Sequence, residues 1–444
     1  MSLITMFPEI LEAGKREYEE LKAGRFRTLE EMGAEGNGWK NQLVLGENGA
    51  FIKALLHNEE IAGKIQMIYI DPPFFTKAGH EAVVQVDRPK EDGGTVKAKH
   101  LAYDDTWSQG IGQYLSMLTS RFMLMRDLLA DEGTIWVHLD WHAVHYVRLL
   151  LDEIFGADRF VNEIVWTYKS GGASKKHFAR KHDTILVYSK TKKYYFQPLK
   201  EKSYNRGYKP YHFKGVEEFQ DELGWYTMVN MKDVWHIDMV GRTSSERTGY
   251  ATQKPEARLA RILAASTREG DLCADFFCGS GTLAAAAQKM NRRWICCDQG
   301  KLAVSATYRR IAELQDETGC CLQEDASMDS TRCLEAEISG RAVTVSGCEV
   351  LLDEGVLEKE DLQKFRQLAE EDPLQMLDCW SVDPDYDGKV HRPKQYFFRR
   401  KGKLEMTALL LDEDAGRNTD CSIVAVDVLG GRYQAVLHRE RERQ

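Results

Sequence analysis

Residues 65–70 read Ile-Gln-Met-Ile-Tyr-Ile, a nearly continuous run of apolar and β-branched side chains. Such a run predicts a strand covered on both faces, as strands in parallel sheets are. It stops at Asp71-Pro72-Pro73-Phe74, where the two prolines lack the N–H groups that a strand ladder needs. We therefore expect a layered fold built around a buried sheet, with Asp71 at the end of one strand.

The rest of the chain alternates between predicted strands and predicted helices. Short apolar runs predict strands at residues 42–46, 65–70, 134–140, 163–168, 183–189, 271–277 and 294–298. Apolar residues at helical spacing predict helices at residues 50–61, 111–130, 143–155, 254–266, 281–290 and 301–318. This alternation indicates an α/β fold with a mostly parallel sheet.

Other stretches depart from this alternation. Residues 1–32 are charged and helix-prone, and the glycine-rich residues 33–38 predict a linker. Residues 78–105 are polar and contain glycine, which predicts a long mobile loop. Beyond about residue 340, short strand-like runs alternate with turns such as Asp-Pro-Asp-Tyr-Asp-Gly (383–388). We expect a small β-rich domain there.

Composition narrows the class of protein. The chain has 444 residues, 43% hydrophobic and 29% charged, which suits a folded protein of two or three domains. No apolar run approaches the roughly 20 residues that cross a bilayer, and the N-terminus lacks the apolar core of a secretory signal. We therefore expect a cytoplasmic protein without a membrane partner. Ten cysteines, all at or after Cys273 and without a C-x-x-C pair, predict buried free thiols.

Charge is distributed unevenly along the chain. The net charge is −9, but residues 168–214 hold 13 Lys and Arg against Asp183 and Glu201, with aromatic residues between them. A local basic surface is what contact with nucleic-acid phosphates requires, although a solvated face is the alternative. The candidate DNA contacts are Lys175, Lys176, Arg180, Lys181, Arg206 and Lys209.

Residues 275–282, Asp-Phe-Phe-Cys-Gly-Ser-Gly-Thr, form a glycine-containing turn between a predicted strand and a predicted helix. The glycines let backbone N–H groups approach a ligand, and an acid at the end of the next strand can hold a ribose. Asp298 occupies that place, close to the roughly 20-residue spacing of nucleotide-binding patterns. Ala284 replaces a third glycine, which disfavours a dinucleotide site, and a plain strand–turn–helix is the alternative. The candidate cofactor residues are Asp275, Phe276, Phe277, Cys278, Gly279, Ser280, Gly281, Thr282 and Asp298.

The chemistry of Asp71-Pro72-Pro73-Phe74 suits an amino group on a planar ring. The Asp71 carboxylate and the Pro72 carbonyl can accept hydrogen bonds from one amine, and Phe74 offers a face for stacking. Enzymes that modify a base turn it out of the duplex and read it by such contacts. A strand-ending turn with a buried aromatic residue is the alternative interpretation.

The two motifs together, with the glycine motif roughly 200 residues after the first, resemble the DNA amino-methyltransferases that act on adenine N6 or cytosine N4. The order resembles their permuted β group, which includes many type III modification subunits. The resemblance covers roughly residues 40–320 and implies a Rossmann-like methyltransferase fold and the cofactor S-adenosylmethionine. It also implies a catalytic role for Asp71, Pro72, Pro73 and Phe74, with Asp71 near the cofactor as well.

Further stretches carry the resemblance. Gly46-Glu47-Asn48 stands where the family has G-D-N, which implies that Glu47 and Asn48 contact the cofactor. Residues 252–263 resemble the family's T-Q-K-P helix start, which implies that Lys254 and Pro255 lie near the methionine end of the cofactor. Residues 181–190 resemble a family strand beside the substrate pocket. The basic segment falls where the family has its target-recognition region.

The patterns along the chain and the family resemblance together predict five regions. They are an N-terminal helical arm and linker (1–39), a catalytic half (40–165), a target-recognition region (166–250), a cofactor-binding half (251–335) and a C-terminal β-rich domain (340–444).

The resemblance predicts a site-specific methyltransferase that flips adenine out of double-stranded DNA and methylates N6 by direct in-line transfer. Cytosine N4 is the first alternative; Asp71 favours adenine because the cytosine enzymes more often carry Ser-Pro-Pro. A non-catalytic DNA-binding subunit and an RNA or protein methyltransferase are the others. A homodimer and a restriction subunit stay open as partners.

His138, Asp140, His142 and His145 form an H-x-D-x-H-x-x-H pattern that superficially suggests a metal site. The first two residues belong to the end of a predicted strand, whereas the two later histidines fall in the following turn and helix. Because metal ligands must converge on one point, we expect no metal there.

Overall fold

A computed structural model describes most of the chain. The described residues are 3–33, 38–86, 94–170, 174–241, 243–314, 319–328, 331–352, 355, 357–410 and 420–438.

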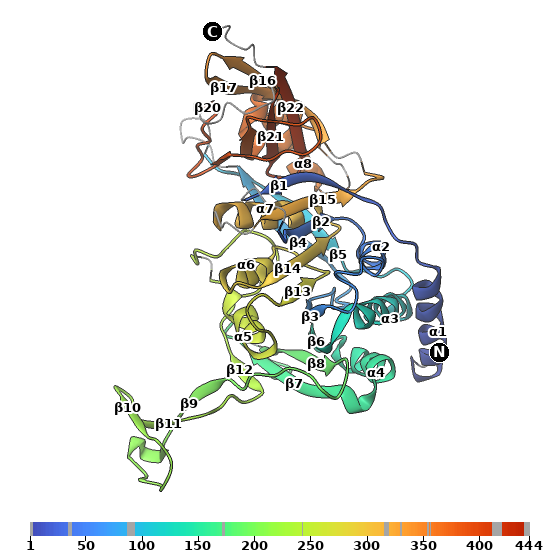
Figure 1. The fold of residues 1–444 in the computed structure, drawn as a ribbon, viewed down its shortest axis with the longest axis vertical. Helices are drawn as coiled ribbons and strands as arrows, with labels where there is room; N and C mark the ends of the chain where they lie inside the picture. Colours follow the sequence, from blue (N-terminus) through green and yellow to red (C-terminus); the bar gives the residue numbers. More distant parts are fainter. Residues whose placement is uncertain are drawn as a thin grey trace.

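A ten-stranded sheet forms the centre of the molecule (Figure 1). Its order is β1-β15-β2-β14-β13-β3-β6-β8-β7-β12, and the six strands from β15 to β6 run parallel to one another. The predicted α/β fold with a mostly parallel sheet is confirmed. The strands are β1 (Phe26–Met32), β2 (Asn41–Leu45), β3 (Ile65–Ile70), β6 (Leu129–Leu139), β7 (Phe160–Thr167), β8 (His182–Ser189), β12 (Val234–His236), β13 (Leu272–Asp275), β14 (Arg293–Asp298) and β15 (Cys320–Asp325).

Helices cover both faces of this sheet. One face carries α1 (Leu3–Glu20), α2 (Asn48–Leu55), α3 (Ile111–Leu128) and α4 (Val144–Phe155). The other carries α5 (Glu256–Ser266), α6 (Thr282–Lys289) and α7 (Lys301–Leu314). The short 3-10 helices are η2 (Ala157–Arg159), η3 (Arg206–Tyr208) and η4 (Pro373–Met376).

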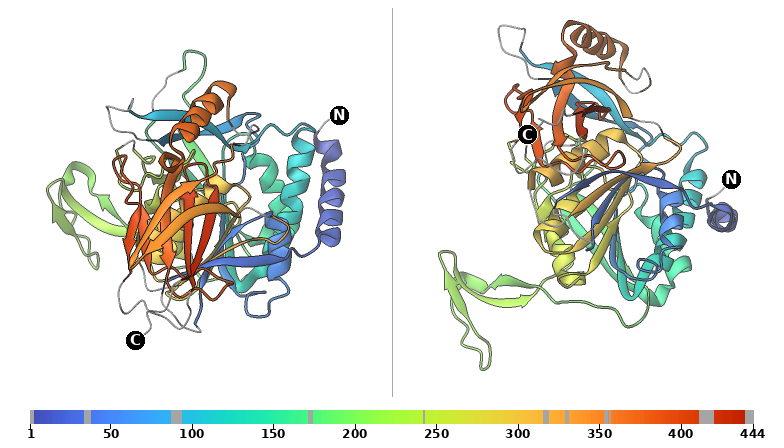
Figure 2. Two further views of the ribbon diagram at one scale, coloured as in Figure 1. Left: turned by 90° about the horizontal axis from the view of Figure 1, so that it is seen from above. Right: turned by 45° about the horizontal axis from the view of Figure 1, so that its top comes forward.

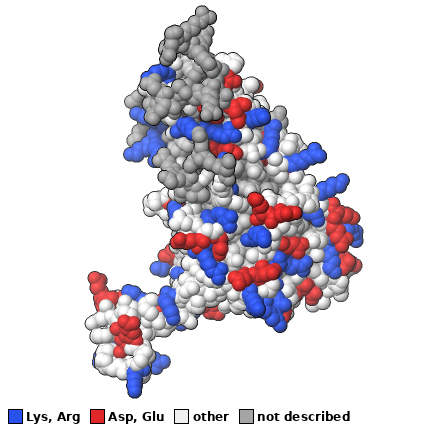
Figure 3. All heavy atoms as spheres, in the orientation of Figure 1, with Lys and Arg blue, Asp and Glu red and all other residues white. Residues whose placement is uncertain are grey.

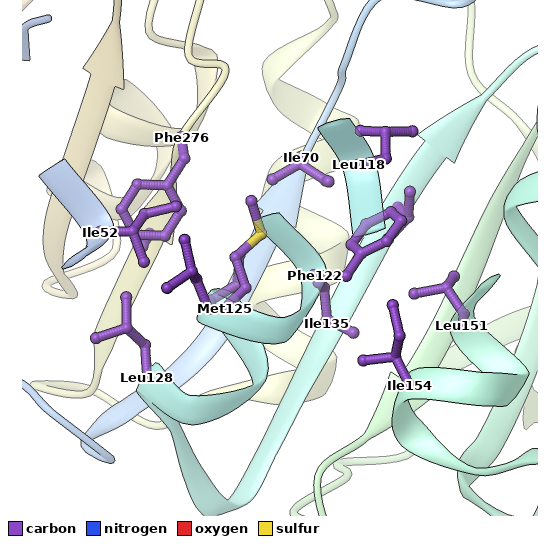
Figure 4. Close-up of a cluster of buried hydrophobic side chains, with 14 of the residues drawn as sticks. Ile52, Ile70, Leu118, Phe122, Met125, Leu128, Ile135, Leu151, Ile154 and Phe276 are labelled. Carbon is purple, nitrogen blue, oxygen red and sulfur yellow. The ribbon is translucent and has the colours of Figure 1, made fainter. Parts of the chain in front are cut away.

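The strand that precedes the Asp71 motif shows why its sequence is apolar throughout. Ile68 and Ile70 point to the face covered by α2, α3 and α4, whereas Met67 and Tyr69 point to the face covered by α5, α6 and α7. In Figure 4, Phe122 and Met125 of α3 lie beside the strands of the first face. Each fully buried side chain of this size contributes about 1.5–3 kcal/mol, so this packing holds the end of β3 in a fixed position.

The N-terminal segment is helical only in part. Helix α1 packs on α3, but residues 26–32, predicted as helix-prone, form the edge strand β1 antiparallel to β15. Strand pairing prevails because it satisfies the backbone, and because the buried Glu30 accepts hydrogen bonds from Tyr308 (2.7 Å) and Arg432 (2.8 Å). Most of the predicted linker, residues 34–37, lies outside the described residues.

The predicted mobile loop at residues 78–105 is wrong. Strands β4 (Gly79–Val86) and β5 (Val96–Asp104) form an antiparallel pair. Their alternating apolar residues, among them Val84, Val86 and Ala98, pack against helix α8 (Lys359–Glu371) of the C-terminal region. Between these apolar residues, the polar side chains of Glu81, Gln85, Lys97 and Lys99 are exposed. Residues 87–93 lie outside the described residues.

Three short strands form an arm that extends from the body of the molecule (Figures 1 and 2). They are β9 (Lys200–Tyr204), β10 (Phe219–Asp221) and β11 (Gly224–Asn230), joined as an antiparallel sheet in the order β10-β11-β9. Charged side chains of both signs are interspersed over the body and the arm on the face drawn in Figure 3.

The predicted C-terminal β-rich domain is confirmed, but its first strand, at residues 331–339, lies before the predicted start at residue 340. Its sheet has the order β19-β18-β21-β22-β16-β17-β20 and a hydrophobic core of its own around Trp380 and Tyr433. The strands are β16 (Thr331–Ser339), β17 (Ala342–Cys348), β18 (Leu377–Asp383), β19 (Gln395–Phe398), β20 (Thr407–Leu409), β21 (Asp420–Asp427) and β22 (Arg432–His438).

The cysteines are free thiols, and nine of the ten are buried as predicted. Cys333, on β16, is exposed, so the prediction is wrong at that position. Among the described residues, no helix is long and apolar enough to cross a membrane.

Candidate active site

A cavity of about 350 Å³ opens at the carboxyl ends of the parallel strands, where ligands bind in sheets of this kind. The two motifs, although roughly 200 residues apart in sequence, both line it. The predicted site residues that line the cavity are Glu47, Asn48, Asp71, Pro72, Pro73, Phe74, Lys254, Asp275, Phe276, Phe277, Cys278, Gly279, Ser280, Thr282 and Asp298. Pro255, which precedes α5, and Gly281, which packs on Thr307, lie behind this lining.

Asp71 follows the last residue of β3, and other side chains hold its carboxylate. Its Oδ1 lies 2.6 Å from His138 Nδ1, and its Oδ2 accepts a hydrogen bond from the Lys254 ammonium. Burial alone would raise the pKa of Asp71, but Lys254 and His138 outweigh burial and hold the pKa below its usual range. The carboxylate is therefore an ionised hydrogen-bond acceptor in a fixed orientation.

Phe74 lies beside this carboxylate. Its ring meets the His138 ring edge-on at 5.2 Å between centroids, and the Lys254 Nζ lies 5.4 Å from its centroid. The aromatic ring and the carboxylate thus share one wall of the cavity, which is the arrangement that a planar ring bearing an amine needs.

His138 and Asp183 are site residues that sequence reasoning missed. His138 is buried, and its Nε2 lies 3.2 Å from Asp183 Oδ2, on the neighbouring antiparallel strand β8. In the sequence, His138 was considered only as part of a pattern that resembles a metal site. Two other residues of that pattern, His142 and Asp140, pair with each other. The available signal was the position of Asp183 at the start of a strand that resembles one beside the substrate pocket.

The glycine motif forms the turn from β13 to α6. Gly279 and Gly281 have φ values of +50° and +68°, which favour glycine. A Cβ on Gly281 would lie 2.4 Å from the Thr307 side chain, so the turn packs too closely for any other residue. The Asp298 carboxylate accepts hydrogen bonds from the N–H groups of Gly279 (2.9 Å) and Gly300 (2.8 Å), which ties the turn to the end of β14.

Glu47 caps helix α2. Its carboxylate accepts hydrogen bonds from the N–H groups of Gly49 (2.9 Å) and Ala50 (2.7 Å) and from Arg121 (2.7 Å). Asn48 donates to the Phe276 carbonyl at 3.0 Å, which joins this corner to the glycine motif. The Glu47 side chain thus folds back on its own helix while still lining the cavity.

The segment after the Asp71 motif is held by Asp105, which comes from the end of the β4–β5 pair. Its carboxylate accepts hydrogen bonds from the N–H groups of Phe75 (3.0 Å) and Thr76 (2.6 Å) and from the Trp107 indole (2.7 Å). Tyr103 and Trp107 line the cavity from the same direction. Sequence reasoning missed Tyr103 and Asp105 because it assigned their segment to a mobile loop, and it assigned no role to Trp107, directly after that segment.

The cavity is acidic. It is lined by the carboxyl groups of Glu47, Asp71, Asp104, Asp275 and Asp298 against two cations, Arg121 and Lys254, among the described residues. Burial raises the pKa of Asp275 well above its usual value and also raises that of Asp298. A ligand with net positive charge would stabilise the ionised forms of these buried carboxyl groups. S-adenosylmethionine, with a sulfonium and an ammonium against one carboxylate, fits this set of residues.

The basic candidates lie in two places. Lys175, Lys176 and Arg180 are exposed in the segment that leads into β8, and Arg180 lies over the Trp141 ring at 3.9 Å. Lys181 in the same segment donates a hydrogen bond to Ser170. Arg206, the first residue of η3, and Lys209, directly after η3, are exposed on the arm.

Comparison with known proteins identifies the family. The N6_N4_Mtase family model, described as DNA methylase, matches residues 65–309. The chain is 29% identical over 332 residues to the type II methyltransferase M.EcaI of Enterobacter cloacae, with 61% of this chain and 69% of the relative covered.

It is also 28% identical over 287 residues to the type II methyltransferase M2.DpnII of Streptococcus pneumoniae, with 63% of this chain and 92% of the relative covered. A solved structure, the cytosine-N4-specific PvuII DNA methyltransferase, matches weakly, at 15% identity and a TM-score of 0.41 over 61% of this chain and 86% of the other. The methyl donor of the matched family is S-adenosylmethionine. Because the family model spans more than half of the chain, this protein belongs to the N6/N4 DNA methylase family and is a DNA methyltransferase.

Proposed function

We propose that the protein methylates adenine N6 at a specific sequence in double-stranded DNA. The observation that carries this proposal is the ionised Asp71 carboxylate, held at the cavity wall beside the Phe74 ring by Lys254 and His138. An aspartate in this position favours an adenine amine. Methylation of cytosine N4 is the alternative, since the cavity and the family match are equally compatible with that target.

When bound, S-adenosylmethionine supplies an electrophilic methyl group. We assign Asp275, Gly279 and Asp298 to its binding, since they line the acidic part of the cavity. Asp71 and the Pro72 carbonyl accept the N–H groups of the target amine and orient its nitrogen. A carboxylate with a lowered pKa is a weak base, so its part is to orient the amine rather than to remove a proton before the transfer. Such positioning supplies a large share of enzymatic rate enhancement.

We assign DNA contact to the exposed basic residues of the segment before β8 and of the arm. Lys175, Lys176 and Arg180 lie close in sequence to Asp183, which is bonded to the site, and Arg206 and Lys209 lie on the arm. Phosphate contacts need exposed cations of this kind, while base contacts decide the sequence that is read. The arm and this segment together would therefore hold the duplex.

The test is to express the protein in a host without DNA methylation and to analyse the nucleosides of its DNA by mass spectrometry, with modification-sensitive sequencing for the motif. We expect N6-methyladenine at one motif. N4-methylcytosine in its place would establish the alternative. If neither modified base is found, both assignments are contradicted.

The matched control is Asp71→Ala, which should abolish DNA methylation while S-adenosylmethionine still binds, as measured by calorimetry. Near-normal turnover in this variant would contradict the role of Asp71. Loss of cofactor binding would show instead that Asp71 acts mainly in the cofactor site.

A further inference from the structure

Both ring nitrogens of His138 face carboxylates. Nδ1 lies 2.6 Å from Asp71 Oδ1, and Nε2 lies 3.2 Å from Asp183 Oδ2. The histidine is fully buried near the carboxyl end of β6. So far it enters only as one of the two groups that hold the Asp71 carboxylate; its ring protons and its contact with Asp183 have no assigned role.

Asp71, His138 and Asp183 form a row of three hydrogen-bonded side chains, and the number of protons in this row follows from hydrogen-bond chemistry. An ionised carboxylate only accepts hydrogen bonds, so each of the two contacts needs a proton from the ring. A neutral imidazole has one N–H and one lone pair, and the lone pair would face a carboxylate oxygen. We propose that His138 carries a proton on both ring nitrogens and positions Asp71 for methyl transfer, while Asp183 orients His138. This inference rests on the proposed function of Asp71.

The surroundings support protons on the ring rather than on the acids. Burial alone would raise the pKa values of Asp71 and Asp183, but their contacts with Lys254 and His138 outweigh burial and lower both. The buried Arg258 also lowers the pKa of Asp71. The carboxylates therefore stay ionised.

The imidazole is also fixed in place. The Trp166 ring meets it edge-on at 5.5 Å, in addition to the contact with Phe74 described above. Tyr168 Oη donates to Asp183 Oδ1 at 3.2 Å, so the outer carboxylate is itself oriented. In the described part of the chain, the charged or titratable groups beside Asp71, His138 and Asp183 include Lys254, Arg258, Tyr69, Tyr168 and Asp275.

The arrangement fixes the plane of the catalytic carboxylate. Lys254 holds Oδ2 and His138 holds Oδ1, so rotation of the Asp71 carboxylate would break one of two charge-assisted hydrogen bonds. The remaining lone pairs then point in a fixed direction at the target amine. An acceptor oriented in advance needs no rearrangement during the reaction. Without the bond from His138, Asp71 could turn toward Lys254 alone.

Two substitutions separate the two contacts of His138. The amide nitrogen of Asn can occupy the place of Nδ1, so His138→Asn keeps a donor to Asp71 and loses the donor to Asp183. The amide nitrogen of Gln reaches the place of Nε2, so His138→Gln keeps the donor to Asp183 and loses the donor to Asp71.

In single-turnover assays with saturating cofactor and DNA, we expect His138→Gln to slow methyl transfer about 100-fold, the loss typical of a misplaced reacting group. His138→Asn should be slowed much less. Both variants lose the buried imidazole and one of its two contacts, so we expect their melting temperatures and cofactor affinities to be similar to each other. Equal losses in the two variants, or no loss in His138→Gln, would overturn the positioning role.

The proton count is measured directly by ¹⁵N NMR of histidine-labelled protein at neutral pH. The resonances that vanish in His138→Asn belong to His138, and we expect both ring nitrogens to be protonated. In Asp183→Asn the new amide can donate to Nε2, so one ring proton should remain. A singly protonated ring in the wild type would overturn the inference.

These measurements test the proposed function and the positioning role of His138 separately. A wild-type protein that methylates no DNA would contradict the proposed function, while the NMR spectrum would still report the ring protons. A methylating wild type with an equally active His138→Gln variant would contradict only the positioning role.

Discussion

The Asp361 carboxylate accepts a hydrogen bond from the backbone N–H of Lys99 at 2.7 Å, which joins helix α8 of the C-terminal domain to strand β5. Figure 2 shows the β4–β5 pair beside this helix. Strand β5 leads into Asp105, which in turn binds the backbone of Phe75 and Thr76 directly after the Asp71 motif. The C-terminal domain therefore helps to fix one wall of the active-site cavity.

Removing an apolar contact between helix α8 and the β4–β5 pair should destabilise the protein. Phe365 of α8 is fully buried against the β4–β5 pair. We expect Phe365→Ala to lower the free energy of unfolding by about 3–5 kcal/mol, as measured by urea denaturation, because it leaves a large cavity. Methyl transfer should fall as well, since the wall of the cavity loosens.

The matched control on the same helix is Gln363→Ala, at an exposed position, which should change stability by less than about 0.5 kcal/mol. Full methyl transfer by a destabilised Phe365→Ala protein would show that the contact between α8 and the β4–β5 pair stabilises the domain without shaping the cavity.

The glycine turn should tolerate no side chain at Gly281. In Gly281→Ala the added methyl group meets Thr307 at 2.4 Å, and the φ of +68° adds about 1–2 kcal/mol of strain. Overpacking adds about 1–3 kcal/mol. We expect lower stability and weaker binding of S-adenosylmethionine, measured by calorimetry.

Gly270→Ala separates the two effects, because Gly270 has a φ of +78° but open space around its Cβ position. It should lose only the stability due to backbone strain and keep its cofactor affinity. Similar affinity losses in both variants would contradict a specific role for the Gly281 turn.

Cofactor affinity should fall as the pH is lowered. Burial raises the pKa values of Asp275 and Asp298 in the free protein, so both groups take up protons at a higher pH than usual, and a bound cation would displace these protons. Binding therefore releases protons, and affinity rises with pH until both groups are ionised in the free protein. Calorimetry in buffers of different ionisation enthalpy measures the protons released.

Asp298→Asn removes one of these titrations while the titration of the cofactor's own amine stays the same. The variant should show a smaller pH dependence than the wild type. An equal dependence in the two proteins would mean that Asp298 is not linked to cofactor binding.

Exposed lysines before β8 should contribute to the salt dependence of DNA binding. We expect the double substitution Lys175→Ala and Lys176→Ala to reduce the slope of log K against log salt by about 2, since each phosphate contact contributes about 0.9. Titrations of a labelled duplex at several salt concentrations measure this slope.

Lys15→Ala is the control, because Lys15 lies on α1, away from the arm in Figure 1. It should leave the slope unchanged. An unchanged slope in the Lys175 and Lys176 variant would mean that this part of the basic segment is a solvated face.

Much of the fold could be predicted because its signals are local. The apolar run before Asp71 and the glycines between β13 and α6 carry their conformations in neighbouring residues, and the predicted strands correspond to β2, β3, β6, β7, β8, β13 and β14. The β4–β5 pair could not be predicted in the same way. Its alternation is interrupted by polar residues, and its stability comes from α8, more than 250 residues later.

The sequence by itself determined the strand-ending Asp71 motif, the glycine turn and the acid at Asp298, since each depends on residues adjacent in the chain. The tertiary structure alone decided which side chains surround Asp71. His138, Asp183 and Lys254 come from β6, β8 and the segment before α5, and their approach depends on strand order and register. A carboxylate's orientation and charge are set by neighbours in space, whose identity no local pattern encodes.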